Sequence, residues 1–321
     1  MRYAQRLAIS LFALLAAGVV PDAALAQAYP SKPIRLLVPF GPGGAADIVA
    51  RLVAPKLAEA LGTSVVVDNR PGGGTIIATE LLANAAPTGY TLMLANISFA
   101  ANPGLHRKLP YDTLKSFVPI VLADVLPNVL LVHPTVPVKS VGDLIALAKS
   151  KPGQLNYGSA GIGSSNHLNS ELFKSSTGID MVHIPYQSGG QLVASILGTQ
   201  VQLAFISLPP ALPHVTAGRL RVLAVTGPHR MATLPDVPTI SETVVPGFVF
   251  HEWHGILAPK GTPREVVNKL NAEINRLIAA PAFKERIEGL GAEVKGSTPQ
   301  QFADHVRTEV AKWTKILKPA D

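Results

Sequence analysis

The stretch Val38-Pro-Phe-Gly-Pro-Gly-Gly-Ala-Ala-Asp47 decides the fold of this chain. It follows the apolar run Ile34–Val38, which predicts a buried strand, and precedes a helical pattern from about Ala45 to Ala60. A strand that ends at glycines and leads into a helix directs several backbone N–H groups to one place, where the helix dipole adds positive potential. The loop contains no Lys or Arg. It therefore predicts an anion site built from backbone dipoles.

This loop differs from two better-known phosphate-binding loops. It lacks the Gly-Lys-Ser/Thr ending of a Walker loop and the Gly-x-Gly-x-x-Gly spacing of a dinucleotide loop. The alternative interpretation is a tight turn that uses its glycines only for positive φ angles. The loop taken alone leaves both interpretations open.

A second loop of the same design lies in the middle of the chain. The segment Leu155-Asn-Tyr157 predicts a strand, Gly158-Ser-Ala-Gly-Ile-Gly-Ser-Ser-Asn166-His167 follows it, and a helix is expected to about Ser176. The order is again strand, glycines and helix N-terminus without a cation. Two such loops in different halves of the chain predict two jaws around one anion.

The N-terminus has the pattern of a secretory signal peptide. Arg2 and Arg6 precede an apolar run from Leu7 to Val20, which is too short to span a bilayer, and Ala24-Leu25-Ala26 forms a small-x-small cleavage site. No Cys follows that site, which argues against a lipoprotein anchor. We expect residues 1–26 to be removed and the protein to be periplasmic, without a membrane anchor.

The remaining chain, Gln27 to Asp321, is long enough for two domains, and predicted strands and helices alternate along it. The full chain carries a net charge of +7 and no Cys, which excludes disulfides, thiolate catalysis and Cys-ligated metals. Its Lys and Arg residues are not clustered with aromatic residues, so we expect no nucleic-acid partner.

No catalytic or metal-binding constellation appears. Gly-x-Ser-x-Gly is absent, and His251 and His254 lack the His-Glu-x-x-His pattern of zinc proteases. His167 lies in the first turn of the helix after the second loop, where it either donates to ligand or loop or simply begins the helix. Asp47 is expected to accept N–H groups of its own helix start, and so to shape the first loop. We expect no catalytic residue, metal or cofactor.

Short motifs along the mature chain occur in the order of a known family. They are Tyr29-Pro-Ser-Lys-Pro-Ile34, Val38-Pro-Phe-Gly-Pro-Gly-Gly44 with Asp47, Val67-Asp-Asn-Arg-Pro-Gly72, Pro87-Thr-Gly-Tyr-Thr91, Lys108-Leu-Pro-Tyr-Asp112, His183-Ile-Pro-Tyr186, Leu223-Ala-Val-Thr226, Leu234-Pro-Asp-Val-Pro-Thr239 and Ala258-Pro-Lys-Gly-Thr-Pro263. In these motifs the chain resembles the Bug-type periplasmic solute receptors of tripartite tricarboxylate transporters.

The resemblance implies an α/β, two-lobed type II periplasmic-binding-protein fold with a mixed sheet in each lobe, flanked by helices. Lobe 1 would comprise residues 27–130 and 226–321 and lobe 2 residues 131–225. Strands would cross between the lobes near Val129–His133 and Val222–Thr226. The protein would be a monomeric, non-catalytic receptor that delivers a small organic carboxylate to a membrane permease. The alternatives are a secreted hydrolase or lyase of the same architecture, or a ligand-sensing co-receptor for a signalling protein.

The resemblance also implies the ligand-binding residues. In the family, the two loops that match Phe40–Gly44 and Ser159–Ser165 grip one carboxylate. The far end of the cleft would contain side chains at other strand ends, with Trp253 or His254 as further candidates. The ligand-binding residues predicted in this way are Phe40, Gly41, Gly43, Gly44, Asp47, Asn96, Ser98, Ser159, Ala160, Gly161, Gly163, Ser164, Ser165, His167, Tyr186, Ile206 and Ser207.

One departure from the family pattern concerns the ligand. Many members carry an acidic residue in the strand and loop matched here by Phe205-Ile206-Ser207, and this chain has Ile206 instead. An ammonium group in a closed cleft normally meets a carboxylate, and Asp47 is the only acid in the two loops. We therefore predict a carboxylate ligand without an amino group.

Overall fold

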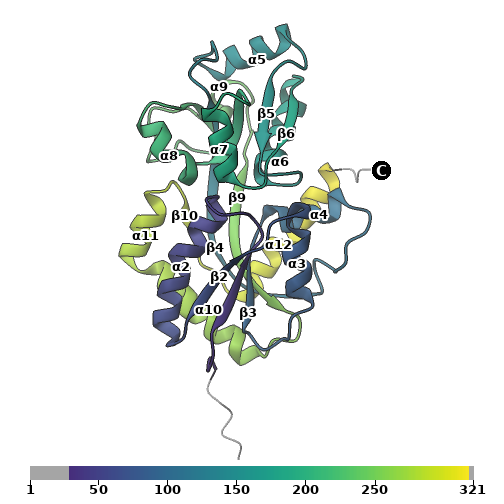
Figure 1. Ribbon diagram of the computed structural model, residues 1–321, viewed down its shortest axis with the longest axis vertical. Coiled ribbons are helices and arrows are strands. Elements are labelled where there is room, and N and C mark those ends of the chain that lie inside the picture. Colours follow the sequence, from purple (N-terminus) through teal and green to yellow (C-terminus); the bar gives the residue numbers. More distant parts are fainter. Residues whose placement is uncertain (1–28, 318–321) are drawn as a thin grey trace, which may run out of the picture. The chain divides into compact units, whose positions relative to one another are not determined.

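The computed structural model describes residues 29–317 (Figure 1). The predicted signal peptide, residues 1–26, lies outside the described residues. The chain divides into two units after Ser31, and the second unit begins at Lys32 and contains every helix and strand of Figure 1.

Ten strands form the framework of the described residues. They are β1 (Ile34–Val38), β2 (Val65–Asn69), β3 (Thr91–Asn96), β4 (Phe117–Val132), β5 (Asn156–Ser159), β6 (Val182–Pro185), β7 (Leu203–Ser207), β8 (Arg221–Val225), β9 (His251–Pro259) and β10 (Glu293–Val294). Of the two strands that precede the glycine loops, β1 has the predicted bounds, whereas β5 begins one residue after the predicted Leu155 and extends to Ser159.

Helices follow most of these strands. They are α2 (Ala45–Leu61), α3 (Ile76–Ala83, after a 3-10 turn), α4 (Ile97–Leu105), α5 (Val141–Ser150), α6 (Ser165–Thr177), α7 (Gly189–Leu197), α8 (Leu208–Thr216), α9 (Ile240–Thr243), α10 (Arg264–Ala279), α11 (Pro281–Glu288) and α12 (Pro299–Ile316). Among these helices of the described part of the chain, none is both long enough and apolar enough to span a bilayer.

The strands form two mixed sheets that share β4. The first has the order β2-β1-β3-β9-β4, with β1 parallel to β2 and β3 and the remaining pairs antiparallel. The second has the order β4-β7-β5-β6, with β5 parallel to β6 and β7, and β8 also pairs with β4. Helices flank both sheets (Figure 1). This is the two-lobed α/β architecture that the sequence predicted.

The strand predicted to cross between the lobes near Val129–His133 is the end of a longer strand. Residues 129–132 are the last part of the 16-residue strand β4, which begins at Phe117. It pairs with β9 as far as Pro127, and from Asn128 onward it pairs with β7. The change of partner therefore comes before Val129, a little earlier in the chain than the predicted crossing.

The segment between β8 and β9 packs against the second sheet. Val225 forms a bridge with Thr239, and Phe248 contacts Phe173 of α6 edge-on. The sequence analysis had assigned residues 226–250 to the first lobe, but these contacts are with elements of the second sheet. The chain returns to the first sheet at His251, the first residue of β9.

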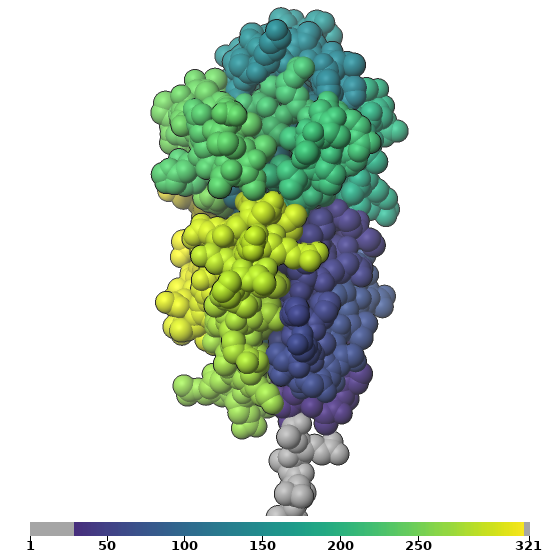
Figure 2. Space-filling view, turned by 90° about the vertical axis from the view of Figure 1, so that its left-hand side faces the viewer, coloured from purple at the N-terminus to yellow at the C-terminus, as the bar shows by residue number. Residues whose placement is uncertain are grey.

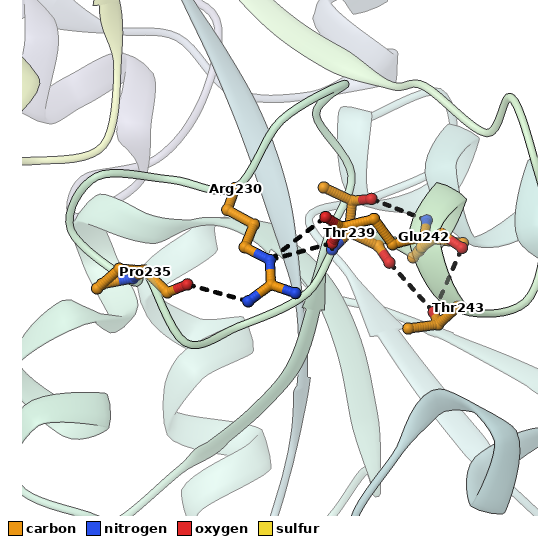
Figure 3. Close-up of polar contacts among 6 residues, drawn as sticks. Arg230, Pro235, Thr239, Glu242 and Thr243 are labelled. Carbon is orange, nitrogen blue, oxygen red and sulfur yellow. Dashed lines mark hydrogen bonds and ion pairs between the residues drawn. The ribbon is translucent and has the colours of Figure 1, made fainter.

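Local hydrogen bonds hold this segment together. In α9, Thr239 and Glu242 form a capping box, with Thr239 N–H donating to Glu242 over 2.7 Å and Glu242 N–H donating to the Thr239 hydroxyl over 3.0 Å (Figure 3). Arg230 donates both to Glu242 and to the carbonyl of Pro235 (Figure 3). The segment is thus an ordered return between the two sheets.

The N-terminal and C-terminal segments build one body together. Figure 2 shows the purple surface around α2 side by side with the yellow-green surface around α10 and α11. A cavity of about 750 Å³ lies between these helices and is lined by side chains that include Lys56, Glu59 and Arg276. Its walls are helix flanks rather than strand ends, so we do not treat it as the ligand site.

Candidate ligand-binding site

The loops at the carboxyl ends of the parallel strands meet around a small cavity. Its volume is about 30 Å³, which leaves room for about two water molecules. The lining residues are Phe40, Gly44, Ala45, Ala46, Ala160, Ser164, Ser165, Asn166, Gly189, Ile206, Ser207, Pro210 and Glu252. They lie at or just after the ends of β1, β5, β6 and β7, and Glu252 comes from β9. This is the edge at which α/β sheets bind ligands.

A larger cavity adjoins this inner cavity. It measures about 510 Å³ and shares Phe40 and Ala160 with the inner cavity. The rest of its lining includes residues 71–75, Ile162 and Tyr186. Neither set of described lining residues includes a Lys or an Arg. An anion here would therefore be held by backbone and neutral side-chain donors.

Four helices begin at the inner cavity, and they differ in the donors they leave free. The first N–H groups of any helix have no partner within that helix. Ser164 caps α6 by accepting from the His167 N–H, and Ser188 caps α7 by accepting from the Gln191 N–H. Helix α8 has prolines near its start and so fewer N–H groups. Helix α2 begins at Gly44 without a side-chain cap, so its first turn retains the most donors for a ligand.

Glycines let two of these helix starts approach each other directly. A Cβ atom built on Gly189 would lie 3.1 Å from the Gly44 Cα, and one built on Gly41 would lie 3.1 Å from the Ser188 Cβ. Both distances are tighter than ordinary van der Waals contact. The loop after β1 and the start of α7 therefore meet backbone to backbone, which requires residues without side chains.

Asp47 accepts hydrogen bonds at the start of its own helix, α2, as the sequence analysis predicted. Its carboxylate accepts from the Gly43 N–H at 3.0 Å, from Asn69 Nδ2 at 2.9 Å and from Arg51 Nε at 3.0 Å. Burial raises the pKa of Asp47, but these hydrogen bonds outweigh burial and the pKa is lowered overall. Asn69 also donates to the Phe40 carbonyl, so the Asp47–Asn69 pair sets the shape of the first loop.

We expect Asp47→Ala to destabilise the protein by about 2–3 kcal/mol, because it removes the buried carboxylate that accepts hydrogen bonds from the Gly43 N–H, Asn69 and Arg51. The free energy of unfolding in urea measures this loss. Asp143→Ala is the matched control, because Asp143 forms an exposed capping box on α5. It should cause a smaller loss. Equal losses in the two variants would contradict the role given to Asp47.

The second loop is organised by side chains from α6 and β6. Ser159 Oγ accepts from the Gly161 N–H at 3.0 Å and lies 2.6 Å from His183 Nε2. His167 Nδ1 accepts from the Gly163 N–H at 3.3 Å. Burial lowers the pKa of His167, which keeps the ring neutral and able to accept. Burial, followed by the repulsion of His167, lowers the pKa of His183 to about 4. His167 thus supports the loop.

A buried acidic residue that the sequence analysis did not identify lines the inner cavity. Glu252 is 5% exposed. Its Oε1 accepts from Asn96 Nδ2 at 3.1 Å, and its Oε2 accepts from Ser165 Oγ at 3.0 Å. Asp47 remains the only acid in the two loops, but Glu252 brings a second acid to the site from β9.

A buried histidine lies behind Glu252 and bridges it to a second acid. His254 Nδ1 is 2.8 Å from Asp124 Oδ1, and His254 Nε2 is 3.7 Å from Glu252 Oε1. Burial lowers the pKa of His254, but the charges of Asp124 and Glu252 outweigh it and the pKa is raised overall. His254 therefore lies between two acidic side chains that favour its protonated form. In the described part of the chain, no group of His, Asp and Glu is arranged to hold a metal ion.

The predicted site residues fall into three groups. Seven line the inner cavity, and they are Phe40, Gly44, Ala160, Ser164, Ser165, Ile206 and Ser207. Gly161 and Tyr186 line the larger cavity. The others line neither cavity: Gly41, Gly43, Asp47, Asn96, Ser98, Ser159, Gly163 and His167. Of these, Asn96 still reaches the site by donating to Glu252.

The structure excludes Trp253 from the site. It is buried and packs edge-on against Phe302 and His305 of α12. Residues along a strand alternate between its two faces. Trp253 therefore points away from the side where Glu252 and His254 lie, and this alternation was the signal that could have led from His254 to Glu252. The inner-cavity residues missed from the sequence are Ala45, Ala46, Asn166, Gly189, Pro210 and Glu252.

Two mixed sheets that share a crossing strand, with helix N-termini converging at their strand ends, define a periplasmic solute-binding protein. Known structures have the same fold. A protein of R. palustris solved with adipate is 36% identical, with a TM-score of 0.87, covering 90% of this chain and 97% of that one. The periplasmic binding protein BugD is 34% identical, with a TM-score of 0.87 and the same coverage. MatC from Rhodopseudomonas palustris, with bound malate, is 30% identical, with a TM-score of 0.86, covering 90% of this chain and 99% of that one.

The chain belongs to the tripartite tricarboxylate transporter family receptors, whose family model matches residues 49–321. Among curated relatives, Protein BugT of Bordetella pertussis is 35% identical over 99% of this chain and 98% of its own length. A protein from the tcbD-tcbE intergenic region of a Pseudomonas species is 39% identical over 91% of this chain and 87% of its own length. The family consists of solute-binding receptors, so this protein is a receptor and not the hydrolase or lyase of the alternative prediction.

Proposed function

We propose that this receptor captures a small organic carboxylate at the inner cavity and delivers it to the permease of a tripartite tricarboxylate transporter. The observation that carries the proposal is the convergence of the starts of α2, α6 and α7 on one cavity whose described lining has no Lys or Arg. Helix starts favour anions, and the start of α2 has no side-chain cap, so its backbone N–H groups remain available to a ligand. The adipate and malate bound by two relatives support a carboxylate.

The lobes that close on the ligand follow from the change of strand partners. We place lobe 1 at residues 32–127 and 251–317 and lobe 2 at residues 128–250. Residues 226–250, which the sequence analysis assigned to lobe 1, are thus assigned to lobe 2. The crossings then lie at Pro127 and Asn128, where β4 exchanges β9 for β7, and before His251. A ligand that contacts both lobes binds the closed arrangement better and shifts the population toward it.

Delivery of the mature receptor to the periplasm would depend on cleavage after Ala26, as the signal-peptide pattern predicts. We also propose that the receptor is a monomer, as the sequence analysis predicted. The prediction of a ligand without an amino group now rests on Ile206 alone, because Glu252 provides the carboxylate that was thought to be missing.

A thermal-shift screen of mono-, di- and tricarboxylates on the mature protein tests the proposed function. A ligand present at 100 times its dissociation constant should add about 2.7 kcal/mol to the stability of the folded state. We expect at least one carboxylate to do so and the corresponding amides to have no effect, because an amide removes the anion. If no carboxylate stabilises the protein, the proposed function is wrong.

A further inference from the structure

Glu252 places a buried carboxylate in a cavity that otherwise favours anions. The inner cavity is lined both by the start of α2, at Gly44, Ala45 and Ala46, and by Glu252. Asn96 and Ser165 each donate one hydrogen bond to Glu252, one on each oxygen. Since an ionised carboxylate has about four lone-pair sites, each oxygen can still accept a hydrogen bond from a ligand.

The charges behind Glu252 do not neutralise it fully. Asp124, His254 and Glu252 are 2%, 0% and 5% exposed, so all three are removed from water. Even with His254 protonated, one cation is shared between two carboxylates and one negative charge remains. A buried charge is stabilised by hydrogen bonds or an opposite charge. A donor on the ligand would supply this stabilisation, and a second anionic group next to Glu252 would be repelled.

The size of the inner cavity limits how far apart the ligand's two polar groups can be. With room for about two water molecules, it holds only the carboxylate end of a ligand, so a donor that reaches Glu252 must lie close to that carboxylate. The body of a longer ligand would extend into the adjoining cavity of about 510 Å³. A donor at the distant end of such a ligand would lie too far from Glu252.

We propose that Glu252 is a specificity-determining residue that selects carboxylates with a hydrogen-bond donor on the neighbouring carbon, that is, 2-hydroxy- or 2-amino-carboxylates. The inference rests on the proposed function, since it assumes that a carboxylate binds at the start of α2. Glu252 accepts the hydrogen bond of the 2-substituent while the backbone N–H groups bind the carboxylate.

Calorimetry with four six-carbon probes tests this proposal at neutral pH. The probes are hexanoate, 2-hydroxyhexanoate, 2-aminohexanoate and 6-hydroxyhexanoate. We expect at least one of the two 2-substituted probes to bind about tenfold or more tighter than both hexanoate and 6-hydroxyhexanoate. Tighter binding of the 2-amino probe would identify a charged donor, and tighter binding of the 2-hydroxy probe a neutral donor that is compatible with the prediction from Ile206.

The variant Glu252→Gln should reduce the preference for the 2-substituent to about threefold or less, because it removes the negative charge while keeping the side-chain size. The control is Glu242→Gln, which makes the same chemical change at the exposed capping box of α9 and should leave the preference unchanged. The ratio of affinities is the readout, because a purely structural defect would weaken all four probes alike.

The outcomes distinguish a failure of the proposed role of Glu252 from a failure of the proposed function. If hexanoate and its 2-substituted forms bind equally well to the wild-type protein, the role of Glu252 is wrong and the carboxylate receptor stands. The same holds if Glu252→Gln keeps the full preference. If Glu252→Gln does not fold, the affinities of the wild-type protein for the four probes still test the role of Glu252. If none of these probes binds and the carboxylate screen also fails, both proposals are wrong.

Discussion

Gly189→Val is expected to weaken ligand binding at least 100-fold while the protein remains folded. A Cβ atom on Gly189 would already lie 3.1 Å from the Gly44 Cα, and the two γ-methyl groups of Val need further space. The contact is with backbone, which cannot rotate out of the way. The start of α7 and the loop after β1 would have to separate, and with them the donors that bind the ligand. Gly44→Val should act in the same way from the opposite side, since its Cβ would lie 3.5 Å from the Gly189 N atom.

The reason for a binding defect without unfolding is conformational. Gly44 has a φ of −84°, which residues with side chains adopt without strain. The substitution therefore disfavours the closed arrangement specifically, and the apparent affinity falls by the factor by which the closed population falls. Calorimetry measures the affinity, and small-angle scattering measures whether saturating ligand still compacts the protein.

Gly142→Val is the control for this prediction. Gly142 lies in α5, where an added Cβ would meet only the Ser140 Oγ, at 3.6 Å. This variant should bind and compact like the wild type. Unchanged affinity and compaction in Gly189→Val would show that the two glycine segments do not have to meet when ligand binds.

The elements with a local sequence signal were predictable, and they are those on which the site is built. The loops after β1 and β5 combine glycines with a helix start. The sequence Thr298-Pro-Gln-Gln301 forms a capping box at the start of α12. The related sequence Thr262-Pro-Arg-Glu265 does not, because α10 begins at Arg264 and the Thr262 hydroxyl donates to the Pro259 carbonyl.

What could not be predicted depends on contacts between segments that are distant in sequence. Strand β4 contains Pro119 and Pro127, although proline cannot donate to a sheet and usually interrupts a strand. In the structure, Pro119 lies beside a register shift and Pro127 at the last pair with β9, so neither breaks the strand. Glu252 was missed because its partners Asn96 and Ser165 lie 156 and 87 residues away in the sequence.

His254→Gln is expected to cause the largest loss of stability, about 3–5 kcal/mol, because it removes the cation between two buried carboxylates. His254 is fully buried, and its Nδ1 lies 2.8 Å from Asp124. Glutamine is similar in size but carries no charge. Urea unfolding at pH 6 measures the loss. The double variant with Asp124→Asn should recover part of it, because it removes one of the two uncompensated charges.

The loss in His254→Gln should also depend on pH in a defined direction. The pKa of His254 is raised in the folded protein, so its contribution to stability is fully present below the unfolded pKa of about 6.5 and is lost as pH rises through the folded pKa. The difference in unfolding free energy between wild type and variant should therefore shrink from pH 6 to pH 9.

The half-buried His305 provides the control. Burial lowers the pKa of His305, which packs against Trp253 and Phe302 on the other side of β9. A neutral His305 makes no such contribution, so the loss in His305→Gln should not shrink above pH 7. If the loss in His254→Gln is the same at pH 6 and pH 9, His254 is neutral in the folded protein. The role of His254 as the cation between Asp124 and Glu252 would then be wrong.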